Sequence, residues 1–391
     1  MLRFIEPFRR LNGLMLACMV ALLAVGVAFV YSSCSVREDA SLRMLYMRHL
    51  EVGVLGLAVY FLLARCNYRT LMEWSGVLYA GCLVLLVLVL VPSIGEAKMG
   101  ARRWLFGIQP AEPAKLAVVM MLAWLFGRRV VGRGAVGLLA AAAVAGVPAA
   151  LILIQPDLGT AMVLVPTVFA MLFAANVAPR LVWPCVGAGA LLAGTLMGLV
   201  YAAEQPGVTP ERRERLIALT HLKDHQVRRL QVFLFPGKDI HGSGYNLWQS
   251  QLAVGSGGAW GKGYLKGEQY SLGYLPPSVS SNDFIFAVLA EEAGFAGSLA
   301  VLLLFSLLLG SGTWVAFRCQ DDTGRLFCVG ILTLTFSHTF INMAMTIGMM
   351  PITGLPLPFI SYGRTFVLTM MAAFGLVQSV SIHGRESETR F

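Results

Sequence analysis

The strongest constraint on the fold of this chain is a series of apolar runs, each about 20 residues long, which recurs from one end of the sequence to the other. A helix needs about that many apolar residues to cross the hydrocarbon core of a bilayer. Only 13% of the 391 residues are charged, against about 25% in an average soluble domain. Because a soluble chain needs a charged surface, we expect an all-α polytopic integral membrane protein.

The runs predict ten membrane helices and one large extracytoplasmic loop between the seventh and the eighth. The expected helices cover residues 11–32, 49–66, 74–94, 112–128, 134–154, 158–177, 181–203, 283–317, 325–349 and 365–382. The eighth is too long for one straight crossing, so we expect it to begin outside the hydrocarbon. The first has no small-residue cleavage site and is expected to be a retained span. The chain is then one membrane domain, with spans one to seven in 1–203, the loop in 204–282 and spans eight to ten in 283–391.

The distribution of basic residues predicts the orientation. With the N-terminus inside, thirteen Arg residues fall in the inner segments, and six Arg or Lys residues fall in the short outer loops. Short cytoplasmic loops carry the excess of basic residues, so both termini are expected in the cytoplasm. The loop at 204–282 is too long for this rule to apply. Seven cysteines form no C-x-x-C pair, so we predict neither a disulfide framework nor a metal site.

The long loop is basic, and its charge has two interpretations. It is either a solvated surface near lipid headgroups or a site for a polyanionic ligand. The basic residues that could contact such a ligand are Arg212, Arg213, Arg215, Lys223, Arg228, Arg229, Lys238, Lys262 and Lys266. Leu216, Leu230, Val232 and Phe233 are spaced as in an amphipathic helix at the membrane interface.

Polar clusters stand at the predicted outer ends of the spans. Arg102, Arg103 and Trp104 precede a helix start in which Glu112 and Lys115 lie three residues apart and are able to pair. The alternative for this cluster is a capped helix start with an aromatic anchor at the interface. Farther on, a tight turn contains Asp157, for which helix capping is the preferred interpretation.

A glycine-rich stretch at 242–263 contains Gln249 and Lys262. Glycines let backbone N–H groups approach an anion closely, but they are also the usual residues of turns. No Walker A pattern is present, which argues against a nucleotide site.

The eighth predicted span opens with Asp283, where water gives way to hydrocarbon. Asp283 is either an ordinary N-cap or a partly desolvated general base. Glu291 and Glu292 follow within the span, where carboxylates are functional candidates by default, although packing against a neighbouring helix is the alternative. Near the end, three prolines between residues 351 and 358 predict a stiff, non-helical outer segment that leads to Ser361 and Arg364.

Taken in order, these segments resemble the SEDS family (shape, elongation, division and sporulation), and within it the elongation branch. The segments that carry the resemblance are G-A-R-R-W, Q-P-x-E-x-A-K, Q-P-D-L-G-T, G-S-G-x-x-G-K-G, D-F-I-F-A-V-x-x-E-E and P-x-T-G-x-P-L-P-F-I-S-Y-G. They run from about Gly100 to the C-terminus. Three positions depart from the family pattern: Pro277 stands where glutamate is usual, Glu268 where threonine is usual, and Arg364 where glycine is usual.

The resemblance implies a ten-span protein of the bacterial cytoplasmic membrane and a peptidoglycan glycosyltransferase that polymerises lipid II on the outer face. It implies a class B penicillin-binding protein and other cell-elongation proteins as partners, and no nucleic acid. Asp283 matches the family's essential outer-loop aspartate. The remaining matched residues are assigned to substrate binding (Arg102, Arg103, Trp104, Glu112, Lys115, Lys262, Ser361 and Arg364) or to support (Asp157, Gln249, Glu291 and Glu292).

The implied reaction fits these residue types. A pyrophosphate leaves without protonation, so cations must hold it, while the acceptor hydroxyl needs a base such as Asp283. Inversion at the sugar requires one carboxylate rather than a nucleophile pair. A divalent cation can assist, although the sequence shows no dedicated ligand set. A lipid II flippase is the leading rival, but transporters usually place polar residues at mid-bilayer. A non-catalytic scaffold for a transpeptidase does not explain the outer polar clusters.

Overall fold

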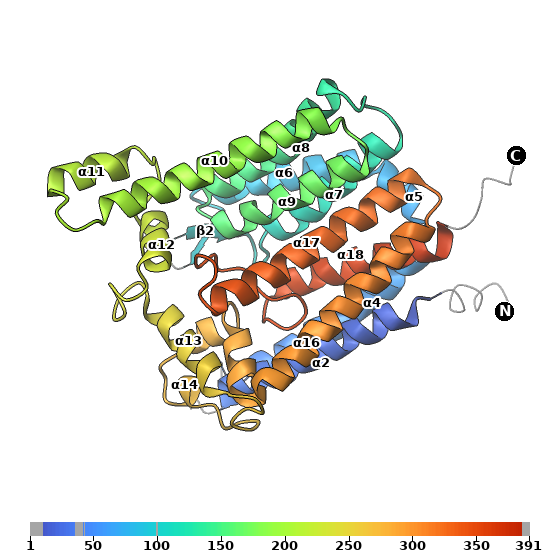
Figure 1. The fold of residues 1–391 in the computed structure, drawn as a ribbon. Coiled ribbons are helices and arrows are strands. Elements are labelled where there is room, and N and C mark those ends of the chain that lie inside the picture. The colour runs from blue at the N-terminus through green and yellow to red at the C-terminus, as the bar shows by residue number, and fades with distance from the viewer. Residues whose placement is uncertain (1–10, 36–41, 43, 99–100, 385–391) are drawn as a thin grey trace, which may run out of the picture.

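The computed structural model describes residues 11–35, 42, 44–98 and 101–384, which form one bundle of long helices. Figure 1 shows the first and last described residues at one end of the bundle, which we call the termini end. The segments that connect α10 to α16 gather at the opposite end, which we call the loop end (Figure 1). Gly100, which begins the Gly-Ala-Arg-Arg-Trp motif, lies outside the described residues.

The described chain has a helix at each of the ten positions where the sequence predicts a membrane helix. These helices are α2 (Gly13–Ser35), α4 (Leu45–Arg65), α6 (Ser75–Leu90), α7 (Ala111–Gly127), α8 (Ala135–Ile154), α9 (Leu158–Ala174), α10 (Pro179–Ala203), α16 (Ile285–Arg318), α17 (Asp322–Thr346) and α18 (Arg364–His383). Seven of the described helices are long and apolar enough to cross a membrane. The other three, α6, α7 and α9, have 16, 17 and 17 residues. A short helix, α5 (Tyr68–Glu73), precedes α6.

The excess length of the eighth span has a structural explanation. Gly294 interrupts α16 with φ 66° and ψ −162°, a conformation that favours glycine. The 24 residues from Phe295 to Arg318 are about 36 Å long as a helix, enough for one crossing. The segment from Ile285 to Ala293 is therefore a separate short helix at the loop end.

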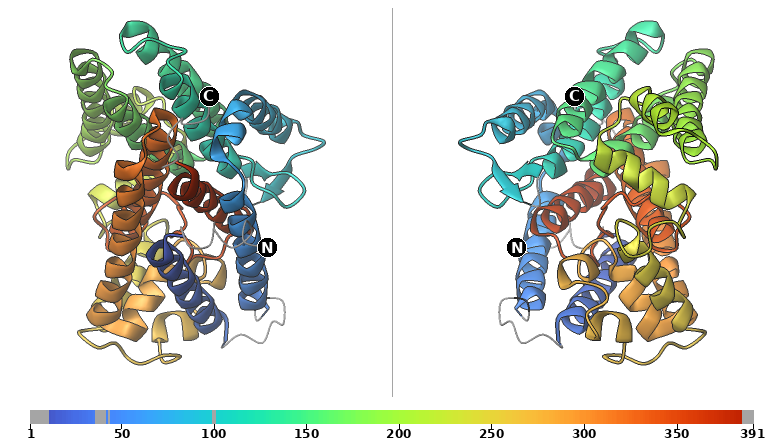
Figure 2. Two further views of the ribbon diagram at one scale, coloured as in Figure 1. Left: turned by 90° about the vertical axis from the view of Figure 1, so that its right-hand side faces the viewer. Right: turned by 90° about the vertical axis from the view of Figure 1, so that its left-hand side faces the viewer.

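Two helices form the centre of the bundle. In the most apolar stretches of α17 and α18, 78% and 83% of the residues are buried inside the protein, whereas in that of α10 only 6% are buried. Figure 2 shows α2 and α4 (blue) beside α16 (orange) on one side of this centre, and the teal and green helices on the other. Most of the surface of α10 is therefore exposed, although the helix contacts α8, α9, α11 and α12.

The long loop folds into short helices instead of an irregular chain. They are α11 (Pro210–Ala218), α12 (Asp224–Leu234), α13 (Tyr245–Ser256), α14 (Glu268–Ser271) and α15 (Pro277–Ser280). The single amphipathic helix suggested by the leucine spacing is divided into α11 and α12. Between α6 and α7 the chain also forms a small antiparallel hairpin of β1 (Glu96–Lys98) and β2 (Ala101–Trp104), which the sequence did not predict.

Candidate functional site

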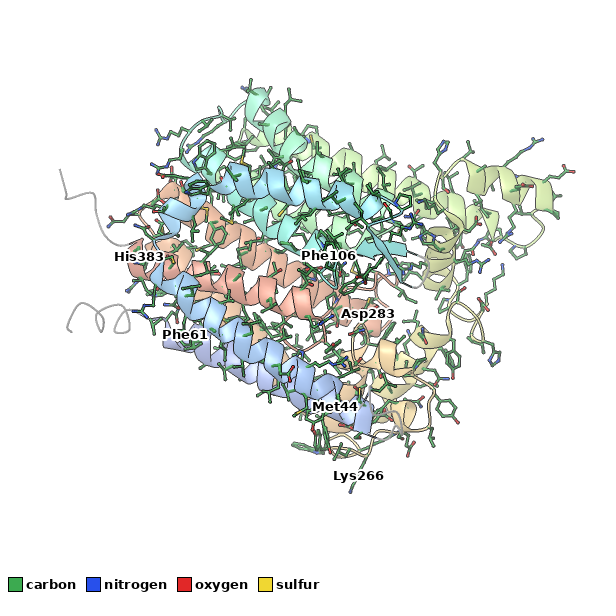
Figure 3. All side chains as sticks on the ribbon, turned by 180° about the vertical axis from the view of Figure 1, so that it is seen from behind. Met44, Phe61, Phe106, Lys266, Asp283 and His383 are labelled. Atoms are coloured by element: carbon green, nitrogen blue, oxygen red, sulfur yellow. The ribbon has the colours of Figure 1, made fainter. Side chains whose placement is uncertain are left out.

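The candidate site is built around Asp283, which lies at the loop end just before α16 (Figure 3). Asp283 is not the N-cap of that helix, because the N-cap is Phe284, and no side chain caps the helix there. The capping role considered from the sequence is therefore wrong, and the carboxylate is left for another role. The Asp283 side chain is partly exposed.

The backbone around Asp283 is fixed by buried side chains of distant elements. Asn342 of α17 donates from Nδ2 to the carbonyl of Asp283 at 2.8 Å and to that of Leu355 at 2.6 Å. The Ser361 hydroxyl donates to the carbonyl of Asn282 at 2.7 Å and accepts from the Leu357 amide at 2.7 Å. These contacts tie Asp283 to the proline-rich segment 351–363, so the carboxylate sits on a rigid base.

The Asp283 carboxylate itself receives no hydrogen bond from the residues that the structure describes. Burial raises the pKa of this carboxyl from 3.8 to about 6, and the charge of Arg229 acts in the opposite direction. Asp157 raises the pKa and Arg103 lowers it. A carboxylate that is partly desolvated and poised near neutral pH is suited to accept a proton.

Gly354 lets the proline-rich segment pass close to this carboxylate. Its φ is +75°, and a Cβ placed there would lie 3.3 Å from Asp283 Oδ2. The carbonyl of the preceding residue, Thr353, accepts a hydrogen bond from Arg229 Nη1 at 3.2 Å. Arg229 lies on α12, so the long loop closes over the segment that supports Asp283.

Arg103 and Asp157 form the second wall of the site. Arg103 donates from Nε to the Gln155 carbonyl at 3.1 Å, donates also to the Pro156 carbonyl, and lies 3.7 Å from Asp157 Oδ2. Asp157 caps α9 by accepting from the Thr160 amide at 3.2 Å, so the capping role is present. Asp157 Oδ2 also accepts from Gln109 Nε2 at 3.1 Å. The charges of Arg103 and Asp157 both act on the pKa of Asp283. The hairpin and the α8–α9 turn, which carry these two residues, therefore belong to the site.

The other residues of the first polar cluster point elsewhere. Arg102 is exposed, on the opposite face of β2 from Arg103, because successive strand residues alternate. Trp104 is partly exposed and pairs in register with Glu96 of β1.

Glu112 and Lys115 form the predicted pair, but deep inside the bundle. The Lys115 ammonium lies 3.0 Å from Glu112 Oε2, and both residues are buried. The Lys115 Nζ is also 2.8 Å from His338 Nε2 of α17, and its charge lies over the Phe366 ring. Glu112 interacts electrostatically with Asp157, so the pair lies behind the wall of the site.

Lys262, Glu291 and Glu292 form a separate structural cluster. Glu291 Oε1 accepts from Lys262 Nζ and from the Glu268 amide, both at 2.8 Å. Glu292 Oε1 accepts from Tyr270 at 2.5 Å and from Ser32 at 2.6 Å. Both glutamates are buried, so the packing alternative describes them well.

The glycine-rich stretch packs against the kink of α16. A Cβ at Gly257 would lie 2.0 Å from the Ala290 carbonyl, and one at Gly261 would lie 2.1 Å from that of Glu292. The amides of Lys262 and Gly263 donate to the carbonyls of Glu291 and Glu292, both at 3.0 Å. These amides are therefore already used, and the glycines permit close backbone approach rather than providing free donors for an anion.

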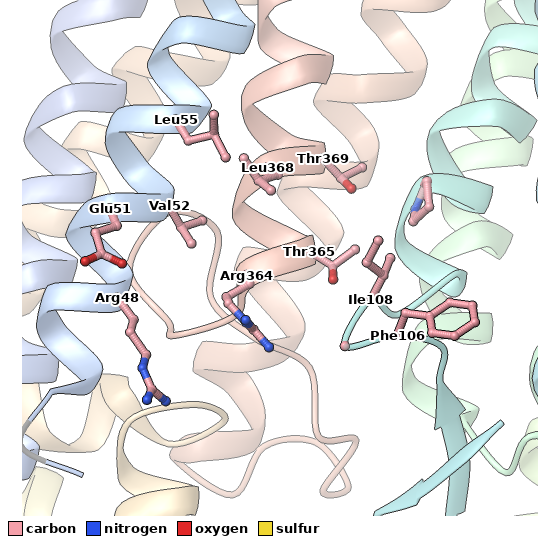
Figure 4. A pocket seen from close by; sticks show the side chains of 12 residues that line it. Arg48, Glu51, Val52, Leu55, Phe106, Ile108, Arg364, Thr365, Leu368 and Thr369 are labelled. Carbon is pink, nitrogen blue, oxygen red and sulfur yellow. The ribbon is translucent and has the colours of Figure 1, made fainter. Parts of the chain in front are cut away.

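Two cavities contain residues of the site or its neighbours in their linings. One, of about 320 Å³, lies under α12 and is lined by His225, Arg228, Arg229 and Asn246 among others. The other is a groove of about 610 Å³ between α4, α18 and the β2–α7 connection, with Arg364 on its wall (Figure 4). Gln249 lies on α13, partly exposed, beside Ser250, whose hydroxyl donates to the Thr346 carbonyl.

Three residues of the site were not among the assigned site residues of the sequence. Asn342 and His338 are polar groups inside an apolar helix, which is a usable signal. Arg229 was considered only among nine basic candidates of the loop, and its place beside Thr353 depends on the tertiary fold.

The described residues contain no group of three or more His, Cys, Asp or Glu side chains that would hold a metal ion. Mg²⁺ commonly uses only one or two carboxylates together with substrate phosphates.

Comparisons with known proteins agree with one another. The profile of the FtsW/RodA/SpoVE family, described as cell cycle protein, matches residues 12–386. The chain is 34% identical over 379 residues to the peptidoglycan glycosyltransferase MrdB of Escherichia coli K12, covering 95% of this chain and 94% of that one. It is similar, with a TM-score of 0.75 and 28% identity, to a chain in a peptidoglycan synthase complex that coordinates polymerization and crosslinking, covering 96% and 99% of the two chains. It is also similar to the rod shape determining protein RodA of Thermus thermophilus, with a TM-score of 0.67 and 26% identity over 96% and 98% of the chains.

Proposed function

The chain belongs to the FtsW/RodA/SpoVE family of cell cycle proteins, and from that premise we propose that it is a peptidoglycan glycosyltransferase that polymerises lipid II during cell elongation. The relative MrdB carries the name of this activity, and the aligned region covers 95% of the present chain. The observation in the structure that best supports the proposal is the Asp283 carboxylate. It is partly exposed, its pKa is raised by burial to about 6, and the described residues give it no hydrogen bond.

In the proposed reaction Asp283 takes the proton of the acceptor's 4-hydroxyl as that oxygen attacks the anomeric carbon of the donor. The bond from this carbon to the pyrophosphate breaks, and the polyprenyl pyrophosphate leaves as a stable anion that needs no proton. A single displacement inverts the anomeric configuration, which requires a base but no protein nucleophile. One available carboxylate is therefore sufficient.

Cations must hold the leaving pyrophosphate while its negative charge develops. We assign this role to Arg103 and Arg229, since their charges act on Asp283 and therefore on the reaction centre. The buried Glu112–Lys115 pair lies behind this wall and is assigned to supporting it. Arg102 and Trp104 are assigned to the outer rim, where they would meet substrate on its way to the site.

We further propose that the loop end faces the cell exterior and that both termini are cytoplasmic. The distribution of basic residues supports this orientation. The exposed Cys66 lies at the termini end and provides a native probe. It should react with an impermeant thiol reagent only when the reagent reaches the cytoplasmic face, whereas a cysteine in place of Arg215 should react from outside. The reverse pattern would remove the site from the side where peptidoglycan is made.

A transpeptidase of the class B penicillin-binding type is the proposed partner. Support comes from the similar chain that was solved within a peptidoglycan synthase complex. The sparsely buried helices α10 and α16 offer lipid-facing surface for such a partner.

The proposal is tested by supplying lipid II to the purified protein together with its transpeptidase partner and measuring glycan strands. We expect strands to form in detergent, where no translocation is involved. Movement of lipid II across liposomes without any strand formation would support a flippase. Glycan strands that form with the partner alone, in the absence of this protein, would indicate a scaffold. Either result would overturn the proposed activity.

A further inference from the structure

The segment 258–266 of the long loop exposes large apolar side chains beside the kink of α16. Trp260 is 83% exposed, and Tyr264 and Leu265 are also exposed. Phe295, the first residue after the kink, is 69% exposed. Exposed apolar surface of this kind marks contact with lipid or with another protein. The level of the segment relative to the membrane helices therefore decides what covers it.

Contacts with α2 place the segment below the loop end of that helix. The Tyr264 hydroxyl donates to the Ala28 carbonyl at 2.8 Å, and the Tyr264 ring packs edge-on against Phe29. Ala28 precedes Ser35, the last residue of α2, by about 10 Å along the helix axis. With 23 residues, α2 is about 35 Å long, only slightly longer than a hydrocarbon core of about 30 Å. The Tyr264 hydroxyl is therefore at a level where α2 lies within the hydrocarbon or at its boundary.

Contacts with α16 place the start of the segment at a similar level. The amide of Phe295 donates to the Gly258 carbonyl at 2.9 Å, and the amide of Ala296 donates to the Ala259 carbonyl at 3.0 Å. Phe295 and Ala296 begin the part of α16 that is long enough for one membrane crossing. The chain at 258–259 therefore lies beside the first turn of a membrane span, and the exposed Trp260 follows directly.

The backbone of the segment is hydrogen-bonded in the way that lipid surroundings require. Non-helical backbone is tolerated at membrane depth only where the protein satisfies its polar groups. The Gly261 amide donates to the Gly257 carbonyl at 2.8 Å, and the amides of Lys262 and Gly263 donate to carbonyls of the short helix that precedes the kink. The segment thus presents apolar side chains outward while these amides are paired inward.

The charges of the segment also suit a membrane interface. Lys262 forms ion pairs with Glu291 at 2.8 Å and with Glu268 at 3.0 Å. Lys266, the other charged residue between 258 and 266, is exposed at the edge of the molecule (Figure 3). The stem of a lysine can lie along acyl chains while its ammonium reaches headgroup phosphates. Trp and Tyr side chains are enriched at the same level of a membrane.

We propose that the segment 258–266 is re-entrant and lies in the lipid leaflet at the loop end, with Trp260, Leu265 and Phe295 against acyl chains and Lys266 at the headgroups. The sequence predicts only an extracytoplasmic loop here. The segment bonds to the backbone of α16 on both sides of its kink. Its insertion therefore holds the kink, and with it the short helix that begins two residues after Asp283, at a defined depth.

Spin-label accessibility measures this depth in purified protein reconstituted into liposomes of phosphatidylethanolamine and phosphatidylglycerol. Nitroxides are attached at W260C or L265C in a protein whose exposed or partly exposed cysteines, Cys66, Cys82 and Cys185, are replaced by alanine. We expect both labels to collide more often with oxygen, which concentrates in lipid, than with the nickel chelate Ni(II)-EDDA, which stays in water.

Two reference labels calibrate the measurement. L303C, at an exposed position in the spanning part of α16, should report lipid, and H241C, in the exposed connection between α12 and α13, should report water. Collision ratios at 260 and 265 that match the ratio of H241C would overturn the proposal. Shielding from both reagents would also overturn it, because the segment would then be covered by another protein chain.

A charged substitution provides an independent test. W260D places a carboxylate at the proposed lipid contact and should lower the melting temperature in nanodiscs, because a carboxylate is costly to desolvate. H241D adds the same charge in the exposed connection and should leave the melting temperature unchanged. A W260D variant that melts with the unchanged protein would contradict insertion. Neither test requires glycan synthesis, so both outcomes are independent of the proposed activity.

Discussion

Two carboxylate sites lie eight residues apart at the start of α16, and their surroundings are opposite. Asp283 is partly exposed and receives no hydrogen bond from the described residues. Glu291 is buried, and Lys262 and two loop amides satisfy it. Asp283 lies just before α16 and Glu291 lies within it, both at the loop end, and both were candidates from the sequence. Only their partners distinguish them.

The difference shows how to separate a reactive group from a structural one. A carboxylate that accepts several hydrogen bonds holds elements together, as Glu291 and Glu292 hold the 260–270 segment against α16 and α2. A carboxylate that is partly desolvated but unpaired has free lone pairs for a substrate proton. The protein fixes the backbone of Asp283 through Asn342 while leaving its side chain free.

The largest expected effect comes from removing the charge at each site in turn. D283N keeps the shape of the side chain but not the proton acceptor, so the rate of glycan synthesis should fall about 10²- to 10⁴-fold. E291Q should keep its rate per folded molecule within a few-fold, because an amide oxygen still accepts from Lys262. Rates should be normalised to folded protein measured by size-exclusion chromatography. Equal losses in the two variants would remove the distinction between the sites.

The ten helices were predictable because the length and spacing of apolar runs are local properties of the sequence. The position of Asp283 was predictable from motif order. The role of Asn342 was not, because its partners Asp283 and Leu355 come together only through packing of α17. The role of the glycine-rich stretch could not be predicted from the sequence either. Its glycines match an anion loop and a packing surface equally well until Gly294 is placed against Gly261.

A smaller effect is expected at Gly354, which brings the supporting segment close to Asp283. G354A places a side chain at φ +75°, a backbone conformation that costs about 1–2 kcal/mol, and it crowds Oδ2 of Asp283. The melting temperature in detergent and the rate of glycan synthesis should both fall. G146A is the matched control, since a Cβ at that position in α8 meets nothing within 4 Å. A harmless G354A would show that the segment does not constrain the carboxylate.

The smallest expected effect is a shift in pH dependence, which in R229Q comes in addition to the loss of rate from removing a cation that holds the pyrophosphate. Arg229 lowers the pKa of Asp283, so R229Q should raise that pKa and move the acid limb of the rate profile to higher pH. R228Q removes the neighbouring arginine, which is not among the charges that act on Asp283, and should leave the limb in place. A limb that does not move in R229Q would place Arg229 outside the electrostatic environment of the base.

The most direct test of Asp283 as the general base is the pH dependence of kcat/KM for lipid II polymerisation by the unchanged protein. The base works in its ionised form, so the rate should be constant above pH 7 and should fall as the pH drops through about 6, where Asp283 takes up its proton. H225Q should show the same acid limb, which excludes the histidine beside Arg229 as its source. A profile that stays flat down to pH 5, or an acid limb that disappears in H225Q, would contradict the assignment of Asp283 as the base.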